Sequence, residues 1–221
     1  DVCSSDLGMG ASTKIGTITT VNGVGNGFSA TSSSTSVQVE YVADALPAGT
    51  VLDVYLITDT TRAQSLITNS TSFVVNLLLA WKATDDTVPD TASGKPISMT
   101  ISNSSIKSGA KIYALLGSTL TDLGVATTDG QATVQITQDP EIVVVRTAPE
   151  TPTAVIGTAG DGNVVVSWTA PTSTGGSDIT SYTVTSSGGQ TCTATTLTCT
   201  VSGLTNGTAY TFVDLYPTNA L

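Results

Sequence analysis

The sequence predicts an all-β protein, and three observations support this fold class. Threonine and serine, 42 and 25 of the 221 residues, are abundant, and β-branched residues such as threonine suit a pleated, half-buried surface. Only 11% of the residues are charged, so the Glu, Lys and Arg that favour helices are scarce. Short apolar runs recur between turn-forming residues, a spacing that is typical of β-sandwiches.

Nine runs of β-forming residues follow one another in the first part of the chain. Turn-forming pairs such as Ser108-Gly109 and Asp129-Gly130 separate them. The segment 8–146 is therefore expected to be a β-sandwich domain of unknown family, with a meander of hairpins over 111–137 and no helix longer than a short turn. The expected strands are 14–21, 36–43, 51–58, 73–82, 97–102, 111–116, 123–127, 132–137 and 141–145.

The side chains that are in phase within these runs form the expected core. Burial of each contributes about 1.5–3 kcal/mol to the free energy of folding. Residues 77–80 have helical propensity, but the apolar run that begins at Phe73 favours a long buried strand. The expected inward set is Val39, Tyr41, Val54, Leu56, Val75, Leu77, Ile101, Tyr113, Leu115, Val134, Ile136 and Val143.

Both ends of the chain are expected to be artificial boundaries. Residues 1–7 have no apolar signal-peptide segment and resemble the translated end of a sequencing adapter, which predicts an artefactual leader on a metagenomic fragment. The alternative is a native strand that happens to have this sequence. The chain stops at Leu221 without a closing strand, so neighbouring domains of a longer parent chain are expected.

A domain boundary is expected near residue 147. All seven Lys and Arg residues precede this position, and the segment Thr-Ala-Pro-Glu-Thr-Pro follows it. Residues before proline prefer an extended conformation, so residues 147–151 are expected to be a linker. The second domain then spans 152–221.

The second part of the chain resembles a fibronectin type III domain, an immunoglobulin-like β-sandwich found along secreted bacterial proteins. Three segments carry the resemblance, which covers 150–212: Asp-Gly-Asn-Val-Val-Val-Ser-Trp at 161–168, Gly-Gly-Ser-Asp-Ile-Thr-Ser-Tyr-Thr-Val at 175–184 and Val-Ser-Gly-Leu-Thr-Asn-Gly-Thr-Ala-Tyr at 201–210. The pattern departs from the family after Phe212, so the resemblance implies six strands at most and a domain that is incomplete at its C-terminus.

The resemblance also implies roles for four side chains. Trp168 and Tyr182 are expected in the core, and Tyr210 is expected to form the tyrosine corner above Leu204. An exposed Trp168 that acts as a sugar platform is the alternative.

Cys192 and Cys199 are predicted to form a disulfide. If the chain turns symmetrically about Thr195-Thr196, the two cysteines face each other across an antiparallel pair, at a Cα separation of about 4.5–5.5 Å. Free buried thiols and a metal pair are the alternatives. A disulfide implies an oxidising compartment, so the expected location is extracellular or at the cell surface.

Composition and motifs exclude several functions. A net charge of −10 without a basic cluster argues against nucleic acid, and no apolar run is long enough for a membrane span in this fragment. Without histidine and without a nucleophile motif, we expect no catalytic residue, no metal site and no cofactor. Asp85, Asp86 and Asp90 are interpreted as a solvated loop, with a weak Ca²⁺ site or catalysis as alternatives.

The sequence therefore predicts a non-catalytic spacer or adhesion segment of a secreted or surface-attached bacterial multidomain protein. The alternative is a carbohydrate-binding accessory region of an extracellular polysaccharide-degrading enzyme, and an exposed coplanar pair among Trp81, Tyr41, Tyr55 and Tyr113 would favour it. Extracellular polysaccharide or a cell-surface ligand is the candidate partner. An enzyme in its own right would need a concave site with two carboxylates.

Overall fold

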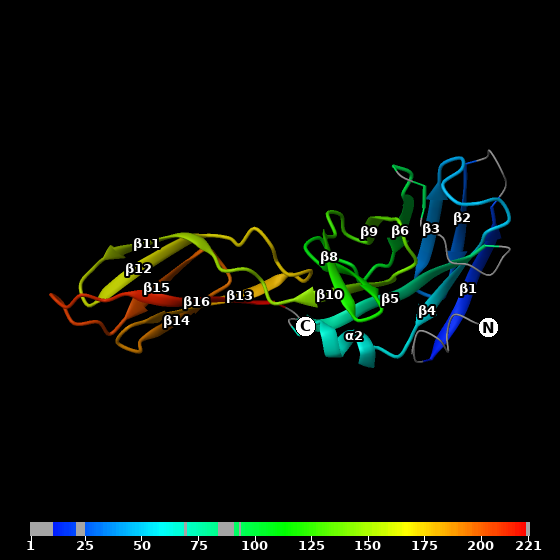
Figure 1. The fold of residues 1–221 in the computed structure, drawn as a ribbon. Coiled ribbons are helices and arrows are strands. Elements are labelled where there is room, and N and C mark those ends of the chain that lie inside the picture. Colours follow the sequence, from blue (N-terminus) through cyan, green and yellow to red (C-terminus); the bar gives the residue numbers. More distant parts are fainter. Residues whose placement is uncertain (1–10, 21–24, 69, 84–90, 93, 220–221) are drawn as a thin grey trace. The chain divides into compact units, whose positions relative to one another are not determined.

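The computed structural model contains two compact units, Asp1–Thr147 and Ala148–Leu221. It describes residues 11–20, 25–68, 70–83, 91–92 and 94–219 (Figure 1). Strands dominate both units, as the sequence predicts, and no helix in the described part is long and apolar enough to cross a membrane.

The first unit is built from two antiparallel sheets. The larger sheet has the strand order β1-β4-β5-β10-β7-β8, and the smaller has the order β2-β3-β6-β9. The larger sheet comprises β1 (Ser12–Thr19), β4 (Val51–Ile57), β5 (Ser70–Lys82), β10 (Glu141–Thr147), β7 (Lys111–Leu116) and β8 (Thr119–Val125). The smaller comprises β2 (Asn26–Thr31), β3 (Ser36–Tyr41), β6 (Ile97–Ser102) and β9 (Gln131–Ile136).

One hydrophobic core joins the two sheets. The smaller sheet contributes side chains at every second position, because its strands alternate between a buried and a polar face. Leu77, Trp81 and Ile142 contribute from the larger sheet, and all three are fully buried. These side chains anchor both central strands, β5 and β10, to the sandwich.

Most of the expected inward set is buried, but three residues lie on the other face of the larger sheet. Leu115 and Val143 are buried with Ala63 and Ile67 in a separate cluster, and Tyr113 packs against that cluster half-buried. The reason is that β10 is buried on both faces. Apolar character alone therefore does not indicate which side chains of this strand, or of its neighbour β7, point into the main core.

The expected meander over 111–137 is wrong beyond its first hairpin. β7 and β8 pair with each other, but β9 pairs with β6 in the smaller sheet.

Strand β2 was not expected from the sequence, because Gly25 and Gly27 suggest a loop. Gly27 instead lies beside β3, where a Cβ atom would come within 2.8 Å of the Val39 carbonyl oxygen.

β1 and β2 belong to different sheets and approach each other closely at Gly16. A Cβ atom at this position would lie only 2.4 Å from the Cβ of Ala30. Real Cβ atoms do not come this close, so Gly16 is required by the space between the strands. The contact closes one side of the sandwich.

A short helix, α2 (Thr61–Leu66), covers part of the outer face of the larger sheet, where the sequence predicts no more than a short turn. Hydrogen bonds from Thr61 to Asp59 at its start lower the pKa of the Asp59 carboxyl group. Arg62 of the helix donates to the carboxylate of Glu141 at 2.8 Å and to the carbonyl oxygen of Gly117. The Glu141 side chain is only 2% exposed, so this ion pair holds the helix on the sheet.

We predict that Arg62→Met lowers the free energy of unfolding of the first unit by about 2–4 kcal/mol, because it leaves the buried Glu141 carboxylate without its cation. The double variant Arg62→Met/Glu141→Leu should recover most of this loss, since it removes both charges. Urea unfolding of the full chain, followed by hydrogen exchange of the β10 amides, measures the effect.

The control is Lys107→Met, which breaks an exposed pair with Asp129 and should change stability by less than about 0.5 kcal/mol. A double variant that is no more stable than Arg62→Met would contradict the account.

The second unit consists of two three-stranded antiparallel sheets, with the orders β11-β12-β15 and β14-β13-β16. Their strands are β11 (Thr153–Ala159), β12 (Asn163–Thr169), β13 (Ile179–Ser186), β14 (Thr191–Ala194), β15 (Thr198–Ser202) and β16 (Phe212–Asn219). The described part of the unit has six strands, the largest number that the resemblance implies, and the departure in sequence after Phe212 does not interrupt the last of them, because β16 begins at Phe212 and pairs with β13 as far as Asn219.

The residues expected to form a linker are partly held by the second unit. Glu150 donates its backbone N–H to the carbonyl oxygen of Ser173, and its carboxylate accepts a hydrogen bond from Thr172. Thr147, at the other end of the segment, is the last residue of β10. The stretch between the last strand of one unit and the first of the next is therefore anchored at Glu150.

Candidate functional site

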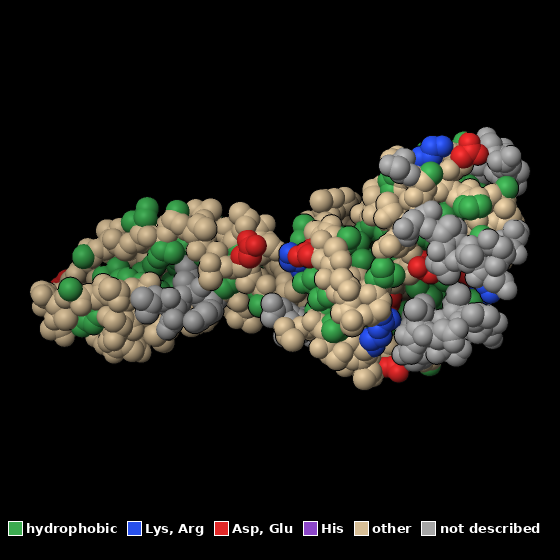
Figure 2. All heavy atoms as spheres, viewed as in Figure 1, with side chains coloured by type: hydrophobic (Ala, Val, Ile, Leu, Met, Phe, Trp, Pro, Cys, Tyr) green, Lys and Arg blue, Asp and Glu red, His purple; other side chains and the backbone are tan. Residues whose placement is uncertain are grey.

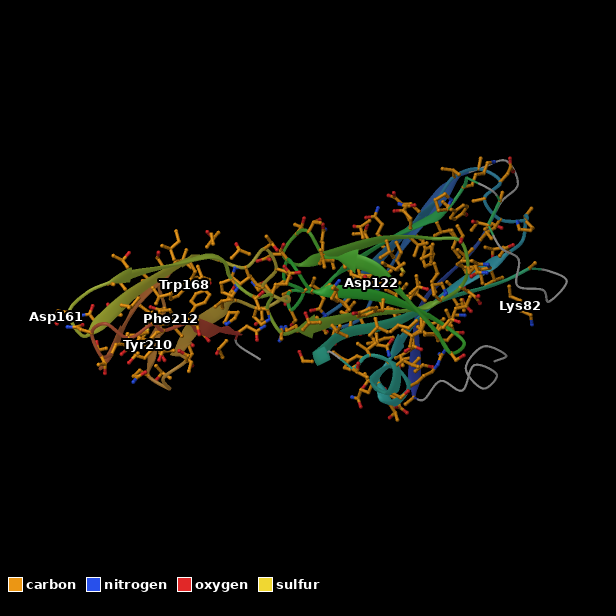
Figure 3. All side chains as sticks on the ribbon, turned by 60° about the vertical axis from the view of Figure 1, so that its left-hand side comes forward. Lys82, Asp122, Asp161, Trp168, Tyr210 and Phe212 are labelled. Atoms are coloured by element: carbon orange, nitrogen blue, oxygen red, sulfur yellow. A yellow bond between two sulfur atoms is a disulfide. The ribbon has the colours of Figure 1, made fainter. Side chains whose placement is uncertain are left out.

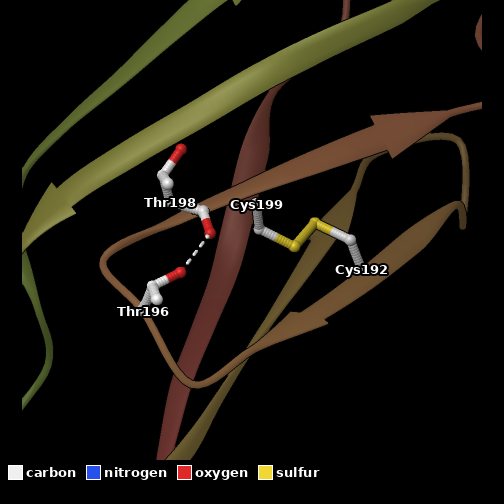
Figure 4. Close-up of a disulfide and its surroundings, with 4 residues drawn as sticks. All are labelled: Cys192, Thr196, Thr198 and Cys199. Carbon is white, nitrogen blue, oxygen red and sulfur yellow. Dashed lines mark hydrogen bonds between the residues drawn. A yellow bond between two sulfur atoms is a disulfide. The ribbon is translucent and has the colours of Figure 1, made fainter.

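The predicted disulfide between Cys192 and Cys199 is present, but its geometry differs from the prediction. Cys192 lies in β14 and Cys199 in β15, and these strands belong to opposite sheets (Figure 4). The Cα atoms are 6.1 Å apart. The two cysteines therefore do not face each other across a hairpin ladder, because the chain crosses to the other sheet between them. The bond ties the two sheets of the unit together.

Trp168 lies in the core of the second unit and is 5% exposed. Its ring packs against that of Tyr182 with centroids 5.3 Å apart, and Tyr182 is also buried. Cys199 belongs to the same buried cluster. This position leaves no ring face of Trp168 for stacking against a sugar.

Leu204 and Tyr210 belong to the segment between β15 and β16, and Tyr210 is labelled in Figure 3. The Tyr210 hydroxyl oxygen accepts a hydrogen bond of 3.1 Å from the backbone N–H of Thr205, and Leu204 packs half-buried against the core. Asn206 extends this corner, since its side chain donates to Asp161 at 2.6 Å and accepts from the Gly162 backbone at 2.8 Å. The hydrogen bonds connect two loops that lie far apart in the sequence.

The acidic residues form no group that could hold a metal ion in the described part of the chain. There, no three His, Cys, Asp or Glu side chains come together. Asp85, Asp86 and Asp90 fall outside the described residues. Asp129 has a lowered pKa because the backbone N–H of Ser108 and the Lys107 ammonium donate to it.

The four aromatic residues considered as a sugar platform do not form one. Trp81 and Tyr41 are buried in the core, at 1% and 6% exposed, and Tyr55 and Tyr113 are half-buried. Burial raises the pKa of the Tyr41 hydroxyl. The aromatic side chains of the first unit therefore serve packing.

The outer face of the smaller sheet is polar and almost uncharged. Thr100 of β6 and Thr133 of β9 face each other with their hydroxyl oxygens 3.1 Å apart. Glu40 is the only charged residue on the three strands of this face. Its outward residues are Ser36, Gln38, Glu40, Ser98, Thr100, Ser102, Gln131, Thr133 and Gln135. Charged side chains are also few on the face of the molecule seen in Figure 2.

A hollow of about 610 Å³ lies at one end of this polar face. Glu40, Ser98 and Gln135 line it together with Lys95 and the exposed Val42. The carboxylate of Glu40 accepts a hydrogen bond of 2.8 Å from Gln38, and the Lys95 ammonium donates at 2.8 Å to the carbonyl oxygen of Ala43. Amide, hydroxyl and carboxylate groups of this kind bind neutral polar ligands through hydrogen bonds. The hollow could not be predicted from the sequence, because its walls come from separate segments.

The topology of the second unit, with its inter-sheet packing and tyrosine corner, defines an immunoglobulin-like β-sandwich. A profile of the fibronectin type III domain family matches residues 147–214, which are therefore a fibronectin type III domain. The match reaches beyond Phe212 into β16. No curated protein matches the chain.

We predict that the double variant Cys192→Ala/Cys199→Ala lowers the stability of the second unit by about 2–3 kcal/mol, because the disulfide restricts the unfolded chain. Thermal unfolding of the full chain with and without reductant measures the loss. Reductant should destabilise the native protein and leave the double variant unchanged. Two alkylated thiols at these positions in unreduced protein would contradict the prediction.

Proposed function

We propose that this chain is a non-catalytic spacer or adhesion segment of a secreted or surface-attached bacterial protein. The observation that carries the proposal is the fibronectin type III domain at residues 147–214, since domains of this family are typically non-catalytic. The chain provides two β-sheet units for such a segment. The inter-sheet disulfide fits an oxidising compartment outside the cytoplasm.

A spacer must keep its units folded when its ends are pulled apart. The disulfide supports this role, because the residues between Cys192 and Cys199 cannot extend while the bond is intact. Anchoring of Glu150 by Ser173 also shortens the free chain between the units.

Single-molecule force spectroscopy on the full chain tests the proposal. Two separate unfolding events are expected, one for each unit. Reduction should lengthen the extension released by the second unit by about 2–3 nm, since it frees a sequence separation of 7 residues. The Cys192→Ala/Cys199→Ala variant serves as the control and should show the longer extension without reductant. Extension of either unit without a resolved unfolding event would contradict a spacer role.

A second candidate function is carbohydrate binding by the first unit. The observation that favours it is the nearly uncharged polar face of the smaller sheet, with the hollow beside Glu40. Neutral sugars are bound through amide and hydroxyl groups such as those of Gln135 and Ser98. A panel of neutral polysaccharides tests this function with the full chain. Retention of the protein on at least one of them is expected, and elution in the void volume from all would overturn it.

A further inference from the structure

A second hollow, of about 200 Å³, opens where β4 separates from β5. The last paired residues of these strands are Leu56 and Leu77. Beyond them β4 ends at Ile57, the chain turns into α2, and β5 continues beside β10. The separation of two neighbouring strands therefore creates the hollow.

Asn76 lines this hollow and is the first residue of β5 beyond the last pair with β4. It is 3% exposed, and neither its amide oxygen nor its amide nitrogen has a hydrogen-bond partner among the described residues. Burying both atoms without partners opposes folding. A ligand that enters the hollow would supply the missing hydrogen bonds.

The lining of the hollow restricts what this ligand can be. None of the lining side chains is charged, which argues against an ion. Phe73 and Ile57, which lie on the same face of the larger sheet as Asn76, add apolar surface, and Thr35, Thr60 and Asn103 also line the hollow with polar groups. Asn103 already donates to the Thr35 hydroxyl at 2.8 Å, which leaves that hydroxyl free to donate. The hollow thus presents apolar surface together with hydrogen-bonding groups of both kinds.

We propose that this hollow binds a single neutral sugar ring, with the Asn76 amide as its anchor. A pyranose has C–H surfaces that pack on an apolar wall and adjacent hydroxyl groups that match the side-by-side donor and acceptor of a carboxamide. The volume equals that of about seven liquid water molecules, which suits one ring and not a longer chain. The proposal rests on the second candidate function, carbohydrate binding by the first unit, and assigns the sugar ring to this hollow and not to the hollow beside Glu40.

The test compares the full chain with Asn76→Leu, which keeps the branched shape of the side chain and removes its polar atoms. Without ligand, Asn76→Leu should raise the unfolding midpoint of the first unit by about 2–6 °C, because no buried amide remains unpaired. Titration with glucose, galactose and mannose should show millimolar binding to the native protein and at least tenfold weaker binding to the variant. Titration with oligosaccharides of the same sugars shows whether the hollow binds the terminal ring of a sugar chain or only a free monosaccharide.

Gln135→Leu removes an amide from the other hollow and tests that hollow as the competing site. Binding that survives in Asn76→Leu and is lost in Gln135→Leu would overturn the proposed site while carbohydrate binding stands. Absence of sugar binding to the native protein would overturn the site and the second candidate function, but not the spacer role. If Asn76→Leu does not fold, the NMR signal of the Asn76 side-chain NH₂ group in the native protein tests the site instead. Saturation with sugar must shift this signal if the proposal is correct.

Discussion

The pairing of β5 with β10 in the middle of the larger sheet is the constraint on which the first unit depends. Both strands carry apolar side chains on both faces, so neither face can be left to water. The smaller sheet covers one face through the main core. Helix α2 and its flanking residues cover part of the other, which explains why a helix occurs in a β-sandwich of this composition.

Two polar residues in these central strands show how the outer face departs from a simple apolar layer. Glu141 of β10 receives its counter-ion from α2, so the helix contributes electrostatic as well as hydrophobic cover. Asn76 of β5 has no such partner, because β4 turns away before it could cover this residue. The chain leaves the sheet at the end of β4. This change of direction leads into the helix that supplies the counter-ion of Glu141, and it also opens the hollow beside Asn76.

In the smaller sheet, β3, β6 and β9 could be predicted from the sequence to within about two residues, whereas β2 was missed. β6 is found at Ile97–Ser102 as expected, because alternation specifies both its limits and its inward side. β10 carries no alternation, so its phase was not predictable. The Cys192–Cys199 pair was predictable from spacing, but the crossing between sheets was not, since turn residues do not say which sheet a strand joins. Each hollow is assembled from segments far apart in the chain, and local patterns contain no information on such contacts.

The close approach of β1 and β2 also limits how this protein can change during evolution. At Gly16 the backbone conformation would accept any residue, and the Cβ of Ala30 is the nearest obstacle to a larger one, with the Phe28 ring 3.3 Å from the same position. The two positions share one volume, so their sizes are coupled: a side chain can be gained on one strand only if it is lost from the other. Among homologues, Gly16 and Ala30 are therefore expected to exchange as a pair, and this covariation would reveal the contact between the two sheets without a structure.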